Sequence, residues 1–154
     1  MSKPLMVHVI TNFAGVGGAE MMLARLIQCT EQQYKHVIIA LMKTSEVYQS
    51  TLDRCQAHCA LDWNGINTLG TVSKLRTLLK KLQPATVQCW MYHANVLTSL
   101  SIIGLAQKPK VVWGIHHSLA SPKDESISTK IALGLSKILS QQASAIIYCA
   151  HSSM

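Results

Sequence analysis

Short apolar runs rich in valine and isoleucine alternate with helical patterns along this chain of 154 residues. The runs are near-continuous rather than alternating in polarity, which is typical of parallel strands buried on both faces. We expect strands at 5–13, 36–42, 57–63, 86–92, 110–117 and 144–150. Helices are expected at 18–32, 45–57, 70–83, 94–107 and 125–142. Because right-handed crossovers join parallel strands, the pattern predicts a doubly wound, Rossmann-like α/β sheet of about six strands with helices on both faces.

The length suits one domain, with 49% hydrophobic and 14% charged residues. The longest apolar stretch, 96–106, is interrupted by polar residues and is shorter than the roughly 20 residues that a membrane span needs. The first residues lead into a strand with no small-residue cleavage site, so no secretory signal is visible. We therefore expect a cytoplasmic protein.

The formal net charge is +7, from 14 basic and 7 acidic residues. Such a balance favours phosphate-bearing ligands, anionic membrane surfaces or nucleic acid. The basic residues are not interleaved with aromatics and no nucleic-acid motif is present, so no nucleic-acid partner is expected. Five scattered cysteines include only one cluster, Cys55 and Cys59, whose spacing is not that of a zinc site. We expect reduced thiols and no bound metal.

A glycine-rich segment, "NFAGVGGAEMML" at 12–23, follows the first expected strand. Ligands of open parallel sheets bind beyond the carboxyl ends of the strands, and amides at a helix N-terminus attract anions. Gly15, Gly17 and Gly18 could therefore cradle phosphate or simply form a tight turn. The dinucleotide fingerprint has a third glycine where this chain has Glu20, and no acidic residue closes the second strand. Glu20 also suits the positive end of the helix dipole.

Histidines follow two other strands on the same predicted edge. His93 comes directly after the fourth strand, and His116 and His117 close the fifth. Imidazole can donate or accept a hydrogen bond and titrates near neutral pH. Beside His93, Tyr92 and Asn95 are possible hydroxyl partners, and Asn95 could instead cap the next helix.

The tryptophans give a weaker signal. They lie in or beside strands, so we expect them to pack in the core, although Trp63, which precedes the polar segment "NGIN", could stack on a sugar ring. A paired-carboxylate glycosidase site and a serine nucleophile elbow are both missing from the sequence. The sequence therefore gives no sign of a glycosidase or of a serine hydrolase.

The segment "HVITNFAGVGGAEMMLARL" resembles the opening of the family 4 glycosyltransferases of the GT-B fold, which have a strand, Gly-Gly-Ala-Glu and an amphipathic helix. The likeness continues in "VQCWMYHANVLTSL" (87–100), "VVWGIHHSL" (111–119) and "IIYCAHSS" (146–153). It implies that residues 1–154 are the N-terminal, acceptor-side half of a GT-B fold. The C-terminal nucleotide-sugar domain would then be absent from this chain.

The resemblance implies retaining transfer from a nucleotide-activated sugar, a UDP- or GDP-sugar, to a saccharide or lipid-linked acceptor. Such enzymes build cell-envelope polysaccharides, which would place the protein at the inner face of the membrane, in contact with anionic lipid. No cofactor is implied, and the D-x-D metal motif is missing.

The resemblance also assigns roles to residues. His93 would be catalytic and lie beside the transferring sugar. The glycines of the loop would contact the donor phosphate. The acceptor-binding residues would be Tyr92, Asn95, His116, His117 and Ser118. Related proteins often have an Arg-His pair where this chain has His-His, which leaves those acceptor contacts open.

Two other functions remain open. The chain could be a non-catalytic binding subunit of a split glycosyltransferase, or a nicotinamide-dependent oxidoreductase. The family's lysine, arginine and glutamate motif for the nucleotide has no counterpart here, so we expect the chain alone to be inactive as a transferase.

Overall fold

The computed structural model describes residues 2–115 and 127–148 of the chain. Its core is one sheet of parallel strands in the order β3-β2-β1-β4-β5-β6. The strands are β1 (Leu5–Ile10), β2 (Lys35–Ala40), β3 (Ala57–Ala60), β4 (Thr86–Trp90), β5 (Lys110–Ile115) and β6 (Ala145–Tyr148). The prediction of a six-stranded, doubly wound α/β sheet is confirmed.

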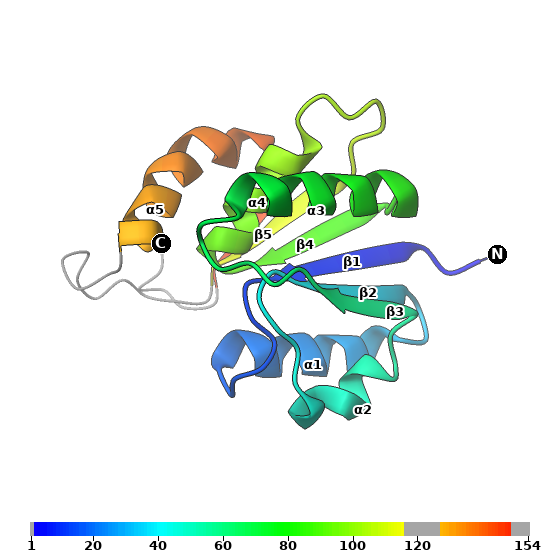
Figure 1. Ribbon diagram of the computed structural model, residues 1–154. Coiled ribbons are helices and arrows are strands. Elements are labelled where there is room, and N and C mark those ends of the chain that lie inside the picture. Colours follow the sequence, from blue (N-terminus) through cyan, green and yellow to red (C-terminus); the bar gives the residue numbers. More distant parts are fainter. Residues whose placement is uncertain (1, 116–126, 149–154) are drawn as a thin grey trace.

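Helices cover the sheet in two layers (Figure 1). One face carries α1 (Gly18–Thr30) and the short helices η1 (Glu46–Tyr48) and α2 (Gln49–Leu52). The other carries α3 (Thr68–Leu82), α4 (Tyr92–Ile102) and α5 (Ile127–Leu139), which continues into η2 (Ser140–Gln142). Because the chain moves outward from β1 in one direction and then returns to add β4 on its other side, the crossovers change face between β1 and β4.

Along each strand, successive buried side chains point to opposite faces of the sheet. Alternate strand residues are buried toward the α3–α5 layer: Val7, Val9, Val37, Ile39, Val87, Cys89, Val111 and Trp113. Their neighbours Ile10, Ile38 and Trp90 pack instead with Leu23 and Ile27 of α1. Every central strand is thus buried on both faces, which explains the near-continuous apolar runs in the sequence.

Two expected helices differ most from their predicted bounds. The helix expected at 45–57 ends at Leu52, where turns follow it. It cannot continue because the Gln56 N–H donates to the carbonyl of His36 in β2, which begins the pairing of β3 with β2. The helix expected at 94–107 begins at Tyr92 and ends at Ile102, shortly before Gly104 adopts a left-handed φ of 71°. His93 therefore lies in the first turn of α4 rather than in a loop before it.

A buried polar chain ties α1 to three strands. The Trp90 indole N–H donates to Nδ1 of His8 (3.4 Å), and Nε2 of His8 lies 3.0 Å from Nδ1 of His36. Nε2 of His36 lies 3.2 Å from the Thr30 hydroxyl, which donates to the Leu26 carbonyl (2.6 Å). Only neutral rings satisfy every link, each donating through Nε2. Burial, with the neighbouring His36, lowers the pKa of His8 to about 3.

Candidate functional site

Two strand-to-helix turns lie side by side at the carboxyl edge of the sheet. One joins β1 to α1 and the other joins β4 to α4. Because β1 and β4 are paired neighbours, with Ile10 opposite Trp90, both turns begin at the same level. This is also the point where the strand order reverses, and open α/β sheets bind ligands there.

The glycines of the first turn are not required by backbone conformation. Among the described glycines, only Gly65 and Gly104 have positive φ, and neither belongs to this turn. A Cβ atom at Gly15 or Gly18 would have no other atom within 4 Å, so both face open space. The interpretation of the segment as a tight turn alone therefore loses its main physical support, while room for a ligand remains.

The N-terminus of α1 has no side-chain cap, since its N-cap residue is Gly17. Glu20 instead folds back toward it: a Cβ atom at Gly17 would meet the Glu20 Oε2 atom at 2.5 Å. The expected position of Glu20 in the first turn is confirmed, and its carboxylate lies at the positive end of the helix dipole. The N-terminus of α1 therefore already attracts a carboxylate, which belongs to a flexible side chain.

An aromatic pair, Phe13 and Tyr48, packs beside the glycine turn and is hydrogen-bonded to it. The Tyr48 ring stacks on Phe13 with centroids 4.2 Å apart, and its hydroxyl donates to the carbonyl of Gly15 (2.9 Å). Burial, and then the charge of Glu20, raises the pKa of Tyr48. Sequence patterns missed this residue, because 33 positions separate it from the glycine that it holds.

The second turn is strained at Met91, the N-cap residue of α4. Met91 has φ 77° and ψ 163°, a region populated essentially by glycine, and its N–H donates to the Gly114 carbonyl (3.1 Å). Such a conformation costs about 1–3 kcal/mol, and strained residues of this kind cluster at functional sites. Here the strain directly precedes Tyr92 and His93.

The ring of Trp63 packs against the ring of His93. Their ring centroids lie 5.1 Å apart at 51°. The Trp63 indole N–H donates to the Thr68 hydroxyl (3.0 Å), which in turn donates to the Gly65 carbonyl (2.7 Å). Trp63 also packs against the core, as expected, so its position is determined by protein contacts. His93 and its neighbour Tyr92 remain half-buried beside it.

Asn95 lies inside α4 and is fully buried, so the prediction that it caps the helix is wrong, because α4 begins earlier, at Tyr92. Neither its amide nitrogen nor its amide oxygen has a hydrogen-bond partner in the described part of the chain. Leaving such a group unsatisfied costs about 1–3 kcal/mol. Its role in acceptor binding stays a prediction. The residues His116, His117 and Ser118 lie outside the described residues.

The cysteine cluster has no metal-binding geometry among residues 2–115 and 127–148, where no three His, Cys, Asp or Glu side chains are placed to hold an ion. Cys55 and Cys59 are free thiols, and burial raises both pKa values, that of Cys55 to about 11. Both are therefore protonated at neutral pH.

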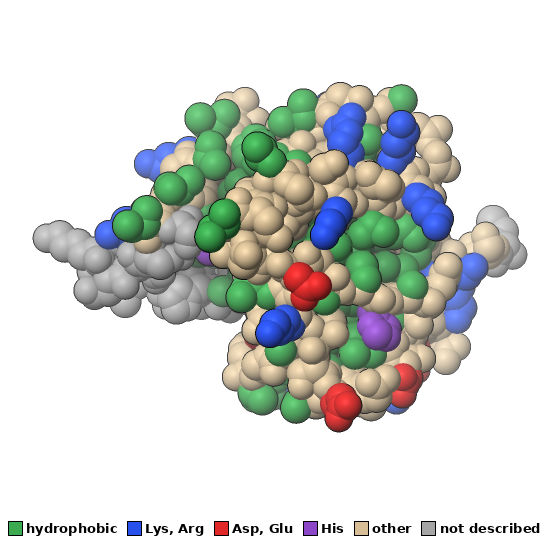
Figure 2. Space-filling model, viewed as in Figure 1, with side chains coloured by type: hydrophobic (Ala, Val, Ile, Leu, Met, Phe, Trp, Pro, Cys, Tyr) green, Lys and Arg blue, Asp and Glu red, His purple; other side chains and the backbone are tan. Residues whose placement is uncertain are grey.

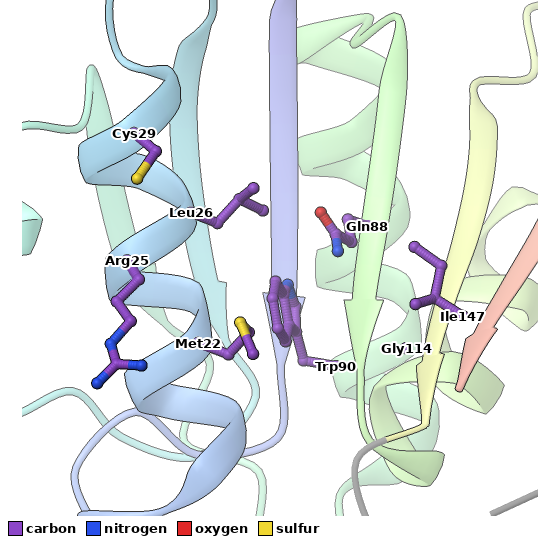
Figure 3. A pocket seen from close by; sticks show the side chains of 8 residues that line it. All are labelled: Met22, Arg25, Leu26, Cys29, Gln88, Trp90, Gly114 and Ile147. Carbon is purple, nitrogen blue, oxygen red and sulfur yellow. The ribbon is translucent and has the colours of Figure 1, made fainter. Parts of the chain in front are cut away.

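An apolar pocket of about 400 Å³ lies between α1 and strands β4–β6. It is lined by Met22, Arg25, Leu26, Cys29, Gln88, Trp90, Gly114 and Ile147. Figure 3 shows Met22 directed toward Trp90, while the Arg25 guanidinium extends away from it. Few polar groups converge here, whereas a sugar nucleotide needs several, so we place the ligand site at the two turns instead.

The fold is Rossmann-like, and the carboxyl edge of its sheet has a helix N-terminus without a side-chain cap and a half-buried histidine. The sequence profile of Glycosyltransferase Family 4 matches residues 16–153. The chain therefore belongs to glycosyltransferase family 4.

Solved structures of glycosyltransferases share the fold. Anabaena HepE in complex with UDP-glucose superposes with a TM-score of 0.69 at 15% identity, covering 96% of this chain and 38% of HepE. Acinetobacter baumannii MurG gives a TM-score of 0.62 at 15% identity, with 99% and 42% covered. The lipopolysaccharide outer core galactosyltransferase WaaB gives 0.56 at 11% identity, with 71% and 32% covered. The chain thus spans about two fifths of the HepE and MurG chains. A comparison with curated protein sequences finds no match.

Proposed function

We propose that the chain is the N-terminal, acceptor-side domain of a retaining glycosyltransferase of the cell envelope. It would act with a nucleotide-sugar domain to transfer sugar from a UDP- or GDP-sugar to a saccharide or lipid-linked acceptor. Family membership and the solved complexes of HepE with UDP and UDP-glucose support this proposal. The observation that carries it is the pairing of the open α1 N-terminus with the constrained His93 at the strand-order reversal.

The glycine turn would contact the donor's diphosphate. Negative charge develops on the leaving diphosphate during transfer, and backbone N–H groups with the α1 dipole stabilise such charge. Gly15 and Gly18 leave room for a phosphate to approach these amides, and the Glu20 carboxylate occupies the space at Gly17. The Glu20 carboxylate must swing away from Gly17 first, because the two anions cannot share that position.

His93 would contact the transferring sugar. An imidazole half-buried against Trp63 has restricted motion, so it loses less freedom when it donates a hydrogen bond to a sugar hydroxyl. Tyr92 and Asn95, together with His116, His117 and Ser118, would form the acceptor side. No cofactor or metal enters this proposal.

Turnover would need residues that this chain does not supply. The chain covers only 38% of HepE, and the family's nucleotide-holding motif has no counterpart in its sequence. We therefore expect the chain alone to release no UDP from UDP-glucose.

A domain-exchange experiment tests the proposal. The chain is fused to the C-terminal half of HepE, and UDP release from UDP-glucose is measured with added acceptor extract. The fusion should turn over. His93→Ala should lower its rate by about 100-fold, whereas His58→Ala, at an exposed position of β3, should leave it unchanged.

Three results would count against the proposal. Turnover by residues 1–154 alone would contradict the division of labour, and full activity of the His93→Ala fusion would remove the histidine from the mechanism. A folded but inactive fusion would favour the binding-subunit alternative. Circular dichroism checks the folding in each case.

A further inference from the structure

The β3–α3 loop, residues 61–67, is closed by hydrogen bonds rather than by apolar packing. The Asn64 side-chain oxygen accepts from the N–H groups of Ile66 (3.0 Å) and Asn67 (3.1 Å). The Asn67 side chain accepts from the Asn64 N–H (3.1 Å) and donates to the Asp62 carbonyl (3.2 Å). Ile66, by contrast, is 93% exposed, and Figure 2 shows hydrophobic side chains at the surface where this loop joins α3. Polar bonds therefore define the shape of the loop.

Capping of α3 does not account for these bonds. Asn67 is the N-cap residue of α3, yet its side chain makes no hydrogen bond that caps the helix. An N-cap asparagine normally accepts from the N–H of the second or third helical residue. Both the oxygen and the nitrogen of this side chain are instead bonded inside the loop. The loop thus has a form that the start of α3 does not require.

The loop holds the ring of Trp63 from two ends. The Trp63 backbone N–H donates to the Leu41 carbonyl (2.7 Å), just beyond the end of β3. The Trp63 indole N–H donates to the Thr68 hydroxyl (3.0 Å), and that hydroxyl donates to the Gly65 carbonyl (2.7 Å). The ring held in this way is the one that packs against His93, with centroids 5.1 Å apart. Thr68 therefore reaches the imidazole of His93 through a single intervening side chain.

Positive φ values occur beside both rings. In the described part of the chain, three residues other than glycine have positive φ: Asp62, Gln83 and Met91. Gln83 ends α3, whereas Asp62 directly precedes Trp63 and Met91 lies two positions before His93. Such backbone persists where the surrounding structure maintains it, and it clusters at functional sites. The contact between the two rings is thus flanked by constrained backbone on both sides.

We propose that Thr68 is a positioning residue for His93 and acts through the Trp63 ring. Its hydrogen bond restricts the rotation of the indole, which in turn restricts the imidazole packed against it. A side chain whose motion is already restricted loses less freedom when it binds a ligand hydroxyl. The effect of Thr68 on turnover rests on the proposed function of His93, whereas its effect on the two rings does not.

The test is an NMR measurement on the chain of 154 residues. A neighbouring indole shifts the resonances of imidazole ring protons, so the His93 Cδ2–H and Cε1–H signals report how the two rings lie. Thr68→Val removes the acceptor of the indole N–H, so both signals should move toward those of a histidine without an aromatic neighbour. Thr68→Ser keeps the hydroxyl and should restore them. In a Trp63→Phe background, which lacks the indole N–H, Thr68→Val should move them no further.

Thr77→Val is the matched control. Thr77 also lies on α3, about 13 Å along the helix from Thr68, and its hydroxyl donates to the Ser73 carbonyl (3.0 Å). The change removes a bond of the same kind, so the His93 signals should equal those of the unaltered chain. Unmoved signals in Thr68→Val, or equal displacement in Thr68→Ser or Thr77→Val, would overturn the inference. If circular dichroism shows that Thr68→Val does not fold, Trp63→Phe removes the same bond from its donor side.

Kinetics of the HepE fusion separate this inference from the proposed function. Thr68→Val should lower kcat about tenfold and leave the KM for UDP-glucose unchanged, and Thr68→Ser should recover kcat. A kcat that Thr68→Val leaves unchanged, while His93→Ala lowers it, would overturn the positioning role. Full activity of the His93→Ala fusion would instead contradict the proposed function, and the ring-proton signals would still decide whether Thr68 positions His93.

Discussion

The two turns at the carboxyl edge differ in their glycine content and in their backbone conformation. The β1–α1 turn contains three glycines, yet none of them has a left-handed backbone, and two face open space. The β4–α4 turn has no glycine, yet Met91 adopts a backbone conformation that glycine prefers. Glycine therefore provides space in the first turn, while backbone strain marks the second.

The difference suits two tasks. A turn with open glycines and a carboxylate on a flexible side chain can admit a charged ligand group, whereas a strained turn followed by a histidine packed against a tryptophan restricts that side chain. Tyr48 holds the first turn through its hydrogen bond to Gly15, and Trp63 contacts the His93 ring that follows the second turn. The two turns can be tested separately, and so can the buried polar chain of Trp90, His8 and His36 in the strands beside them.

Acid should lower the stability of the protein through the buried polar chain of Trp90, His8 and His36. His8 and Trp90 lie in the two strands that precede the turns. Folding lowers the pKa of His8 from 6.5 to about 3, so its stabilising contribution is complete above pH 6.5 and is lost as the pH falls toward 3. Between pH 7.5 and pH 4.5 the free energy of unfolding in urea should fall by about 3 kcal/mol from this residue alone. His58→Gln, at an exposed position, should show the same fall. Unchanged stability at pH 4.5 would rule out a neutral His8–His36 chain.

Asn95 should be more costly to stability than its hydrophobic counterpart. Asn95→Leu removes a buried amide without partners in the described part of the chain, so the free energy of unfolding should rise by about 1–2 kcal/mol. In the fusion protein the same change should lower turnover if the amide binds acceptor. A destabilised Asn95→Leu would show that the amide is satisfied in the folded protein.

Met91 should reverse the usual order of alanine and glycine. Both Met91→Ala and Met91→Gly lose the same packing, but only glycine relieves the strained φ of 77°. We expect Met91→Gly to be about 1 kcal/mol more stable than Met91→Ala in thermal unfolding. At Gly18, which begins α1 with ordinary φ, the alanine variant should be at least as stable as the native chain. Equal stability of the two variants at position 91 would remove strain from the comparison.

Tyr48→Phe should loosen the glycine turn with a small global effect. It removes the hydrogen bond to the Gly15 carbonyl while keeping the ring stack on Phe13, so stability should fall by about 1 kcal/mol. Amide hydrogen exchange should accelerate at residues 15–17 and not at Met91. Exchange that rises equally in both turns would mean that Tyr48 does not act locally.

The sequence was sufficient for the fold because its signals are local and repeated. Near-continuous apolar runs alternating with helices that carry apolar stripes predicted six parallel strands. The pairing of β1 with β4 then sets their order across the sheet. Helix ends were harder, as at Leu52, where pairing of the next strand with β2 ends the helical turns. Such competition between distant segments leaves no mark in a local pattern.

The candidate site was predicted only in its strand-end positions. His93 and the glycines follow strands, so their placement at one edge could be derived from the alternation of elements. The supports could not, because Tyr48 and Trp63 reach their partners from other elements of the chain. The strain at Met91 had no signal either, because nothing about a methionine in a sequence indicates a positive φ.

The most direct test of the central claim is a titration of the labelled chain with UDP-glucose, followed by amide chemical shifts, with NADH as the comparison. We predict UDP-glucose shifts concentrated at Gly15, Gly17, Gly18 and His93, with weaker changes for NADH. Saturable shifts with NADH at lower concentration, or UDP-glucose shifts that avoid both turns, would contradict the assignment of this edge to a sugar-nucleotide site.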